Sequence, residues 1–400
     1  MSAAAMTRGR GTTAKGIVLV LSQVLPVMAI VSLFPAIPKL AAHFGAHPHA
    51  QWLIPMIVTI PSLCIALFSP VAGWVVDRFG RRPCFVGALG LYFLMGIMPL
   101  LIDDLPLIVA SRALLGVAEA GIITTSSALI GDYFGEQRYR WVSWVGVATS
   151  VFGTLLIAAG GALADISWRG PFAVYAASLP IFLVALAVID EPLTPVADTK
   201  KASPAAFPWK EAAIIGSVTM VTSLLYYVEP LHIATVLLDK GAGSATRIGL
   251  IQAATSIAYI GGAFFYRRLH ERTVGQLLAI AGLFIGAGLV VIALAPGHGW
   301  ASVGATIQQF GAGMVIPSLL AWGQARLPIE QRGRGMGIWA TTFFSGLFLC
   351  PPLVSLVGGL TGGLQPAMLA LGLLTLLLAA VPPFLFGRAR AAAAPSPSKA

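Results

Sequence analysis

Long apolar runs, repeated along the whole chain and separated by short polar segments, limit this sequence to one class of fold. Each run is close to the ~20 residues that a helix needs to cross the ~30 Å hydrocarbon core of a bilayer. Because unpaired backbone groups are too costly in lipid, such runs must be helical. Twelve runs occur, at 16–38, 51–76, 83–102, 106–131, 141–164, 171–189, 212–238, 248–266, 274–295, 301–325, 337–358 and 364–387. The sequence therefore predicts an all-α integral membrane protein with twelve transmembrane helices in two pseudo-symmetric six-helix halves.

Polar segments divide this pattern into five parts. We expect a cytoplasmic N-terminal tail at 1–15, a first bundle at 16–189, a cytoplasmic linker at 190–211, a second bundle at 212–387 and a disordered tail at 388–400. The basic start of the chain could begin a signal peptide, but no convincing cleavage site follows, so we expect the first run to be retained. With 57% hydrophobic and 10% charged residues, the chain leaves no room for a soluble catalytic or nucleotide-binding domain.

The basic residues are distributed unevenly between the two sides of the predicted membrane. If both termini are cytoplasmic, the cytoplasmic segments hold twenty of the 25 lysines and arginines, whereas the opposite side holds four. Positive charge favours the cytoplasmic side, so we expect a multi-pass protein of the cell inner (plasma) membrane with both termini inside. The net charge of +10 lies in short loops, which argues against a nucleic-acid-binding face.

Several kinds of site are not expected. The three cysteines, Cys64, Cys84 and Cys350, lie inside apolar runs without ligand-type spacing, so we predict neither a metal site nor a disulfide. The sequence carries no phosphate-binding loop motif, which removes ATP hydrolysis as an energy source. It offers no Ser/His/Asp constellation within the runs, and we therefore predict no enzyme activity and no cofactor.

The loop between the second and third runs carries a specific motif. Residues 73–82 read Gly-Trp-Val-Val-Asp-Arg-Phe-Gly-Arg-Arg, and the pattern is carried by Gly73, Asp77, Arg78, Gly80, Arg81 and Arg82. Gly73 would let a neighbouring helix approach closely, and Gly80 supplies the freedom for a turn. Arginines alone would also fit an ordinary cytoplasmic loop, but the full motif resembles the loop 2–3 signature of the major facilitator superfamily of transporters. The resemblance implies that Asp77 locks the loop against a helix of the other half when the cytoplasmic side is closed.

The two halves also repeat each other, as parallel repeats do in that superfamily. The segments 136–140 and 330–334 read Glu-Gln-Arg-Tyr-Arg and Glu-Gln-Arg-Gly-Arg, at an offset of 194 residues. The second half has Tyr266 where the first has Asp77, so only the first half carries the aspartate. The resemblance covers about residues 16–387 and implies that helices 1, 4, 7 and 10 line a central cavity.

Three charged residues lie well inside the runs: Arg112 and Glu119 in the fourth, and Glu229 in the seventh. A charge near the bilayer centre costs about 3 kcal/mol or more, so each is a candidate functional residue. Arg112 and Glu119 are seven residues apart and share a helix face. Burial favours the neutral form of a carboxyl group, whereas a nearby guanidinium favours the ionised form. Glu119 can therefore change protonation as the cavity opens and closes, and we predict that it couples transport to protons. The resemblance ties Arg112 to proton transfer as well; alternatively, Arg112 is a structural residue that binds backbone carbonyls of helix 1.

The segment around Glu119 suggests a subfamily. Gly-Val-Ala-Glu-Ala at 116–120 looks like the fourth helix of Spinster-type lipid and organic-anion transporters. Those proteins also carry an acidic residue in helix 1, where this chain has Gln23 and a proline, so the resemblance to them is partial.

Further polar residues are expected to line the cavity. They are Gln23 in helix 1, Thr222 and Tyr226 on the Glu229 face of helix 7, and Gln308 and Gln309 in helix 10. Pro230 should break helix 7 near its outer end, which makes Glu229 either a second proton site, an outer gate or a solvated residue at the helix mouth. We expect one glutamine to face the cavity and the other a neighbouring helix.

Together these features predict a proton-coupled secondary active transporter of a small or amphipathic organic solute that works by alternating access. Apolar cavity helices favour efflux, although Leu-Ile at 156–157 replaces the Gly-Pro of drug antiporters in this superfamily. Arg112 favours the alternative, uptake of an organic anion. A non-transporting membrane receptor or chaperone is a further alternative, against which the buried charges argue. The expected partners are the substrate, protons and the lipid bilayer, and we expect a monomer.

Overall fold

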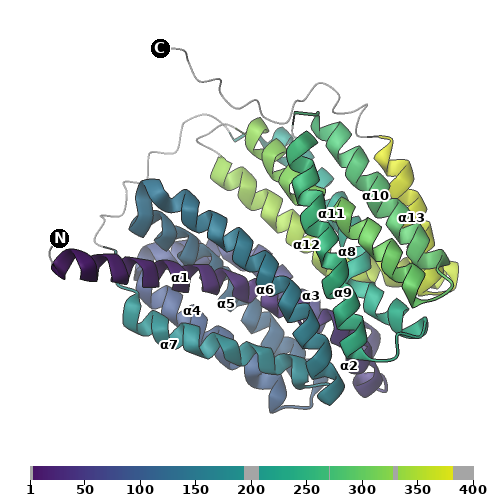
Figure 1. The fold of residues 1–400 in the computed structure, drawn as a ribbon, viewed down its shortest axis with the longest axis horizontal. Helices are drawn as coiled ribbons and strands as arrows, with labels where there is room; N and C mark the ends of the chain where they lie inside the picture. Colours follow the sequence, from purple (N-terminus) through teal and green to yellow (C-terminus); the bar gives the residue numbers. More distant parts are fainter. Residues whose placement is uncertain (1–2, 193–206, 270, 328–331, 382–400) are drawn as a thin grey trace. The chain divides into compact units, whose positions relative to one another are not determined.

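The chain folds almost entirely into helices in a computed structural model that describes residues 3–192, 207–269, 271–327 and 332–381 (Figure 1). It divides into two compact units, Met1–Ala202 and Ser203–Ala400. The division falls inside the segment 190–211 that was expected to be a linker. Most of that segment and the whole expected tail at 388–400 lie outside the described residues.

The first unit is a bundle in which α5 packs against both α3 and α4, while α1 packs along α6. Its helices are α1 (Ala3–Val31), α2 (Ile37–Phe44), α3 (Ala50–Phe79), α4 (Arg81–Ile97), α5 (Leu105–Phe134), α6 (Arg138–Ile166) and α7 (Ser178–Val188), with 3₁₀ segments at Phe34–Ala36, Met98–Leu100, Gly135–Gln137 and Gly170–Ala177. Small residues permit this packing. A Cβ added to Gly116 of α5 would lie 2.4 Å from the backbone oxygen of Pro61 in α3.

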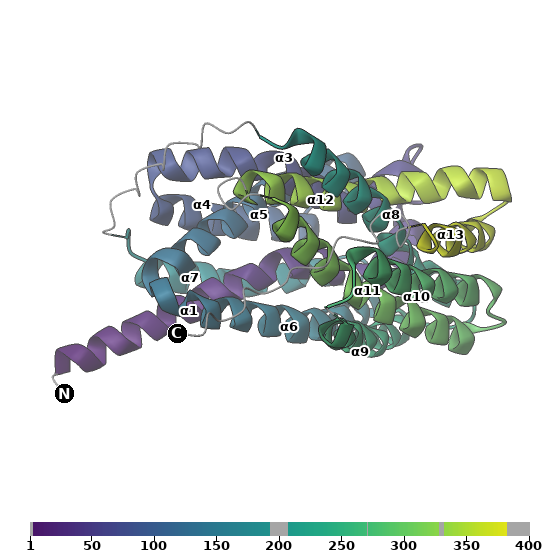
Figure 2. The ribbon, with the colours of Figure 1, turned by 90° about the horizontal axis from the view of Figure 1, so that it is seen from above.

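The second unit is a bundle in which α10 packs against both α11 and α13 (Figures 1 and 2), while α9 packs on α11 and α8 on α12. Its helices are α8 (Trp209–Asp239), α9 (Ala245–Leu269), α10 (Val274–Leu294), α11 (His298–Arg326), α12 (Arg332–Thr361) and α13 (Leu364–Ala379). Backbones again meet closely, because a Cβ at Gly262 of α9 would overlap the carbonyl oxygen of Phe310 in α11.

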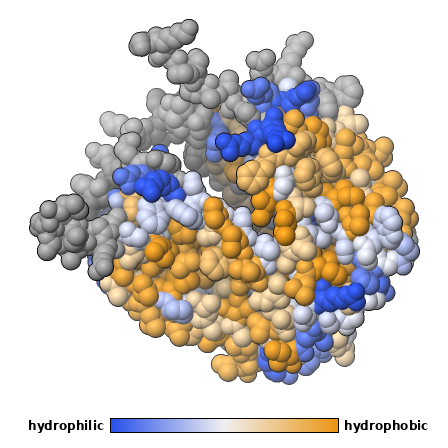
Figure 3. Space-filling view, in the orientation of Figure 1, coloured by the Kyte–Doolittle hydropathy of each residue, from blue (hydrophilic) through white to orange (hydrophobic). Residues whose placement is uncertain are grey.

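The helices have the length and composition that membrane spans require. Within the described ranges, eleven helical stretches are long and apolar enough to cross a bilayer, and α13 is a shorter apolar helix whose expected end at 387 lies beyond residue 381. On the face drawn in Figure 3, apolar side chains cover the lengths of the helices and hydrophilic ones gather toward their ends. The prediction of an all-α membrane protein with six helical runs in each half is confirmed.

Several boundaries differ from those expected. The helix α1 begins at Ala3, so most of the expected tail 1–15 is helical, in keeping with the high helix propensity of its alanines. The first run is interrupted after Val31, because Pro35 has no backbone N–H to continue the α-helical pattern. At the other end of the expected linker, α8 already begins at Trp209.

The expectation that Pro230 breaks its helix is wrong. The helix α8 continues through Pro230 to Asp239. A proline removes only one N–H donor, and transmembrane helices tolerate that loss when neighbouring groups satisfy the freed carbonyl. Glu229 therefore lies within a helix, ten residues before its end, and not at a helix mouth.

Candidate functional site: buried charged and polar residues

The three charged residues that the sequence places inside apolar runs are buried. Arg112 and Glu119 are 0% exposed and Glu229 is 1% exposed; in the part of the chain that the structure describes, they are the only charged side chains in the buried class. Two lie on α5 of the first unit and one on α8 of the second, so each unit has its own buried charge.

Arg112 is held by the neighbouring helix α4. Its Nη2 donates to the carbonyl oxygens of Met95, at 2.5 Å, and Gly96, at 3.1 Å. Its guanidinium carbon also lies 4.7 Å from the ring centroid of Tyr175 and 5.2 Å from that of Phe172. Backbone carbonyls thus bind Arg112, as its structural alternative predicted, but they belong to α4 and not to helix 1.

The contacts of Arg112 leave part of its hydrogen-bonding capacity unused. Its Nε and Nη1 are buried and have no hydrogen-bond partner among the described residues. An arginine carries five N–H donors in a planar fork, so the fork is anchored at one tip while its other donors remain available.

Glu119 lies two turns further along α5, on the same face. Both of its carboxylate oxygens are buried, and neither has a hydrogen-bond partner among the described residues. The neighbouring Gly116 lies directly against the backbone of α3, so the face that carries both charges is covered by protein. The two residues share a face without forming an ion pair.

Gln23 connects helix α1 to the same helix α5. Its Nε2 donates to Ser127 Oγ at 3.0 Å. Gln23 is only partly buried, and it lies two turns of α5 beyond Glu119, since Ser127 is eight residues further along. The structure thus brings Gln23 to the helix of Arg112 and Glu119 without direct contact with either.

In the second unit, α8 and α11 are joined by two hydrogen bonds from consecutive glutamines. Gln309 Nε2 donates to Glu229 Oε2 at 2.6 Å, and Gln308 Nε2 donates to the carbonyl oxygen of Tyr226 at 3.1 Å. Both glutamines therefore bind α8, whereas the sequence had assigned only one of them to a neighbouring helix. Glu229, unlike Glu119, has a neutral amide donor on its carboxylate.

The remaining residues predicted on α8 separate into two places. Tyr226 lies in an aromatic cluster with Tyr227, 4.7 Å away between ring centroids, and with Phe343 of α12, 5.8 Å away. Thr222 instead lines an apolar groove between α8, α10, α11 and α13. The structure brings Tyr226, Glu229, Gln308 and Gln309 together and leaves Thr222 outside that group.

The loop motif at 73–82 forms a tight turn between α3 and α4. Gly80 has a φ of 92°, a conformation that favours glycine. The backbone N–H groups of Arg81 and Arg82 donate to Glu191, at 2.7 Å to Oε1 and 2.8 Å to Oε2. A carboxylate at a helix N-terminus is stabilised by the helix dipole. Glu191 therefore caps α4 and ties the end of the sixth run to this turn.

The motif arginines make further contacts within the first unit. Arg81 forms an ion pair with Asp132 near the end of α5, and Arg82 Nε donates to the carbonyl oxygen of Ile189 at 2.7 Å. Asp132 and Glu191 were not predicted as partners from the sequence. Both are acidic residues at the ends of apolar runs, on the side expected to be cytoplasmic. That placement could have predicted that they pair with the motif arginines.

Two expectations about the motif receive no support within the first unit. A Cβ added to Gly73 would meet no heavy atom within 4 Å, so the expected close approach of a neighbouring helix at Gly73 is absent from that unit. Asp77 and Arg78 are exposed, and Arg78 lies 5.6 Å from the Trp74 ring centroid. The predicted contact of Asp77 with the other half remains a prediction.

A second polar cluster lies at the opposite ends of these helices. His43 Nε2 and Asp103 Oδ1 are 2.9 Å apart, Arg169 lies 3.5 Å from the same carboxylate, and the ring of His43 stacks on Trp168. The hydrogen bond with His43, followed by the charge of Arg169, holds the pKa of Asp103 below its usual value. The cluster connects α2 to the segments that precede α5 and α7, and it was not predicted from the sequence.

Comparison with known proteins supports the fold and confirms the family that the loop motif predicted. The model of the Major Facilitator Superfamily matches residues 19–238 and 212–400. An uncharacterised MFS-type transporter of Salmonella typhimurium is 27% identical over 80% of this chain and 83% of its own. The efflux pump dotC of Dothistroma septosporum is 27% identical over 38% of this chain, and the matched part spans 26% of that pump's length.

A solved structure has the same fold along nearly its whole length. A bacterial homologue of the human lysosomal transporter Spinster, in an inward-facing and occupied conformation, aligns with a TM-score of 0.75 at 16% identity and covers 95% of this chain and 98% of its own. With the family model matched across both six-helix units, the chain belongs to the Major Facilitator Superfamily of transporters.

Proposed function

We propose that the protein is a proton-coupled secondary active transporter of a small or amphipathic organic solute that works by alternating access in the cell inner membrane. The observation that supports this most strongly is Glu119, whose two oxygens are buried and without a hydrogen bond among the described residues. A scaffold protein gains nothing from such a residue, because burying a carboxyl group without hydrogen bonds costs free energy that other interactions must offset.

The energetics of Glu119 supply the coupling. A charge near the bilayer centre costs about 3 kcal/mol or more, so the buried carboxyl group is expected to be in its neutral, protonated form. If water reaches this face of α5 in another conformation, the carboxylate becomes tolerable and the proton can leave. Protonation thereby changes the relative free energy of two conformations, which is what coupling requires.

Arg112 is the candidate for contact with the substrate. Its carbonyl bonds to Met95 and Gly96 fix the guanidinium, and its unused Nε and Nη1 donors form part of a fork that suits a carboxylate or phosphate. This favours the alternative direction, uptake of an organic anion. The apolar surroundings and the partial likeness to an efflux pump favour export, which we retain as the leading direction.

The proposal is tested with Glu119→Gln in proteoliposomes that contain a pH-sensitive dye. Organic anions, organic cations and neutral amphiphiles are added with and without an imposed pH gradient. We expect the variant to lose gradient-driven transport and solute-induced proton movement to below about a tenth of wild type, while solute exchange without a gradient persists, because glutamine keeps the shape but cannot carry the proton.

The matched control is Glu271→Gln, which removes an exposed carboxylate of the second unit and should transport as wild type does. Gradient-driven transport by Glu119→Gln at the wild-type rate would overturn the assignment of the proton site. No transport of any solute by the wild-type protein, in either direction, would favour the receptor or chaperone alternative.

A further inference from the structure

The second unit contains a groove that the proposed transport does not use. It lies between α8, α10, α11 and α13, has a volume of about 280 Å³, and is lined by residues that include Ser217, Val221, Leu278, Gly282, Thr375 and Ala379. We call it the α8–α10–α13 groove. Gly282 and Ala379 form its narrow part, where a Cβ on Gly282 would lie 3.0 Å from the Ala379 Cβ.

The groove is apolar and open. Val221 and Val381 at its edge are 47% and 43% exposed. The helices α8, α10 and α11 have the length and composition of membrane spans, so the groove lies at the depth of the hydrocarbon core. Water is a poor occupant of an apolar space, so at this depth the groove suits an acyl chain, which is held there by van der Waals packing and not by transfer out of water.

Positive charge lies at one end of this groove. The helices α8 and α10 both begin at that end. Lys210 precedes Ser217 by seven residues and shares its face of α8, about 10 Å further along. Arg272 lies just before the first turn of α10, six residues before Leu278. Both side chains are exposed.

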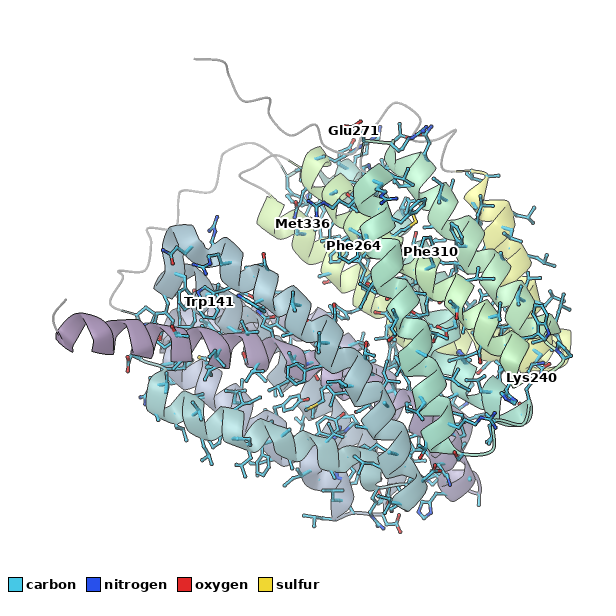
Figure 4. The ribbon with its side chains drawn as sticks, viewed as in Figure 1. Trp141, Lys240, Phe264, Glu271, Phe310 and Met336 are labelled. Atoms are coloured by element: carbon cyan, nitrogen blue, oxygen red, sulfur yellow. The ribbon has the colours of Figure 1, made fainter. Side chains whose placement is uncertain are left out.

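The neighbouring acidic residues offset only part of this charge. Glu211 is paired with Arg326 at 2.7 Å. Among the residues that the structure describes, Glu271, beside Arg272, is the other carboxylate near this end. Glu271 and Lys240 lie at opposite ends of the second unit (Figure 4), so Glu271 marks the end at which α10 begins. Trp209 is 64% exposed one residue before Lys210, and tryptophan is enriched at the level of lipid head groups.

We infer that the α8–α10–α13 groove binds an anionic phospholipid. One acyl chain occupies the apolar groove, and the phosphate lies against Lys210 and Arg272 at its rim. Lysine and arginine near an anionic lipid surface each contribute measurably to binding, and the groove fixes the chain that a loose surface contact would leave free. A zwitterionic lipid has an acyl chain that fits the groove, but its own cationic group offsets the attraction of its phosphate for the positive rim.

The test measures dissociation constants of purified full-length protein in detergent for fluorescent phosphatidylglycerol and phosphatidylcholine with the same acyl chains. We expect wild type to bind phosphatidylglycerol about tenfold more tightly. The double variant Lys210→Gln/Arg272→Gln should lose that preference. Arg138→Gln/Arg140→Gln, which removes two exposed arginines of the first unit, should keep it.

Filling the groove tests the acyl-chain part separately. Val221→Phe should weaken both lipids about tenfold, whereas the control Val303→Phe, at a residue that is 46% exposed and outside the groove lining, should weaken neither. Should Val221→Phe fail to elute as a single folded species, Ser217→Leu replaces it.

Equal wild-type affinity for the two lipids, or a preference that survives Lys210→Gln/Arg272→Gln, would overturn the inference. So would unchanged binding in the folded groove-filling variant, because the charges alone would then hold the lipid.

Discussion

The closest helix contact beside the candidate proton site can be tested at Gly116. Replacement by alanine would put a Cβ 2.4 Å from the backbone oxygen of Pro61, 2.5 Å from its Cα and 2.8 Å from the Cys64 Cβ. Two of these three atoms are backbone and cannot rotate away, so α3 and α5 must separate. Overpacking of this kind costs typically about 1–3 kcal/mol.

One effect acts in the opposite direction. Alanine is about 1 kcal/mol more favourable than glycine in a helix interior, so the net destabilisation of Gly116→Ala should be about 0–2 kcal/mol. Gly131 provides the matched control, because it lies on the same helix α5 and an added Cβ meets nothing within 4 Å. Gly131→Ala should be neutral or up to about 1 kcal/mol more stable. The two variants should therefore differ by about 2 kcal/mol.

Unfolding in mixed micelles with increasing sodium dodecyl sulfate, followed by tryptophan fluorescence, measures this difference. Gly116→Ala should also lower proton-coupled transport, since Glu119 is less than one turn away and moves with the helix. If Gly116→Ala and Gly131→Ala unfold at the same detergent fraction, the contact between α3 and α5 does not have the tightness on which this reasoning depends.

Three further substitutions probe the candidate site and the loop motif. Arg112→Lys should keep the charge but lose the planar fork, in which Nη2 binds two carbonyls while Nε and Nη1 are left without a partner among the described residues, so transport should fall at least about tenfold; full activity would mean that only a point charge is needed. Asp77→Asn should shift the protein toward its inward-facing state and slow turnover, with about a tenfold change in the population ratio for 1.4 kcal/mol; unchanged spin-label distances across the two faces would limit the motif to a role in topology. Glu191→Gln should destabilise the protein by about 0.3–2 kcal/mol, because the α4 N-terminus loses its carboxylate. Glu271→Gln serves as its control, and equal unfolding of these two variants would argue against a capping role.

The sequence predicted those features that depend on local composition. Run length and hydropathy were sufficient to predict the helices, because the bilayer thickness sets the length of a spanning helix and its hydrocarbon core requires apolar side chains. The cost of charge in hydrocarbon was sufficient to find Arg112, Glu119 and Glu229, all of which are buried. The spacing of Arg112 and Glu119 on one face followed from helix geometry alone.

The partners of these residues could not be predicted in the same way. Arg112 binds α4 carbonyls, and Glu191 binds the α3–α4 turn from about 110 residues away. Such pairings depend on how helices pack, which a single sequence does not encode in any local pattern. Pro230 shows the reverse case, where a strong local preference against helix is overridden. The carbonyl oxygen of Tyr226, four residues before Pro230, accepts a hydrogen bond from Gln308 of α11 in place of the missing N–H.

The capping of α4 by Glu191 also fixes the end of α7 to the loop motif. Glu191 accepts hydrogen bonds from the backbone N–H groups of Arg81 and Arg82, and Arg82 donates to the carbonyl oxygen of Ile189, directly after α7. A rotation of the α3–α4 turn therefore carries the end of α7 with it, so the loop motif and the C-terminal end of the first bundle move as one body.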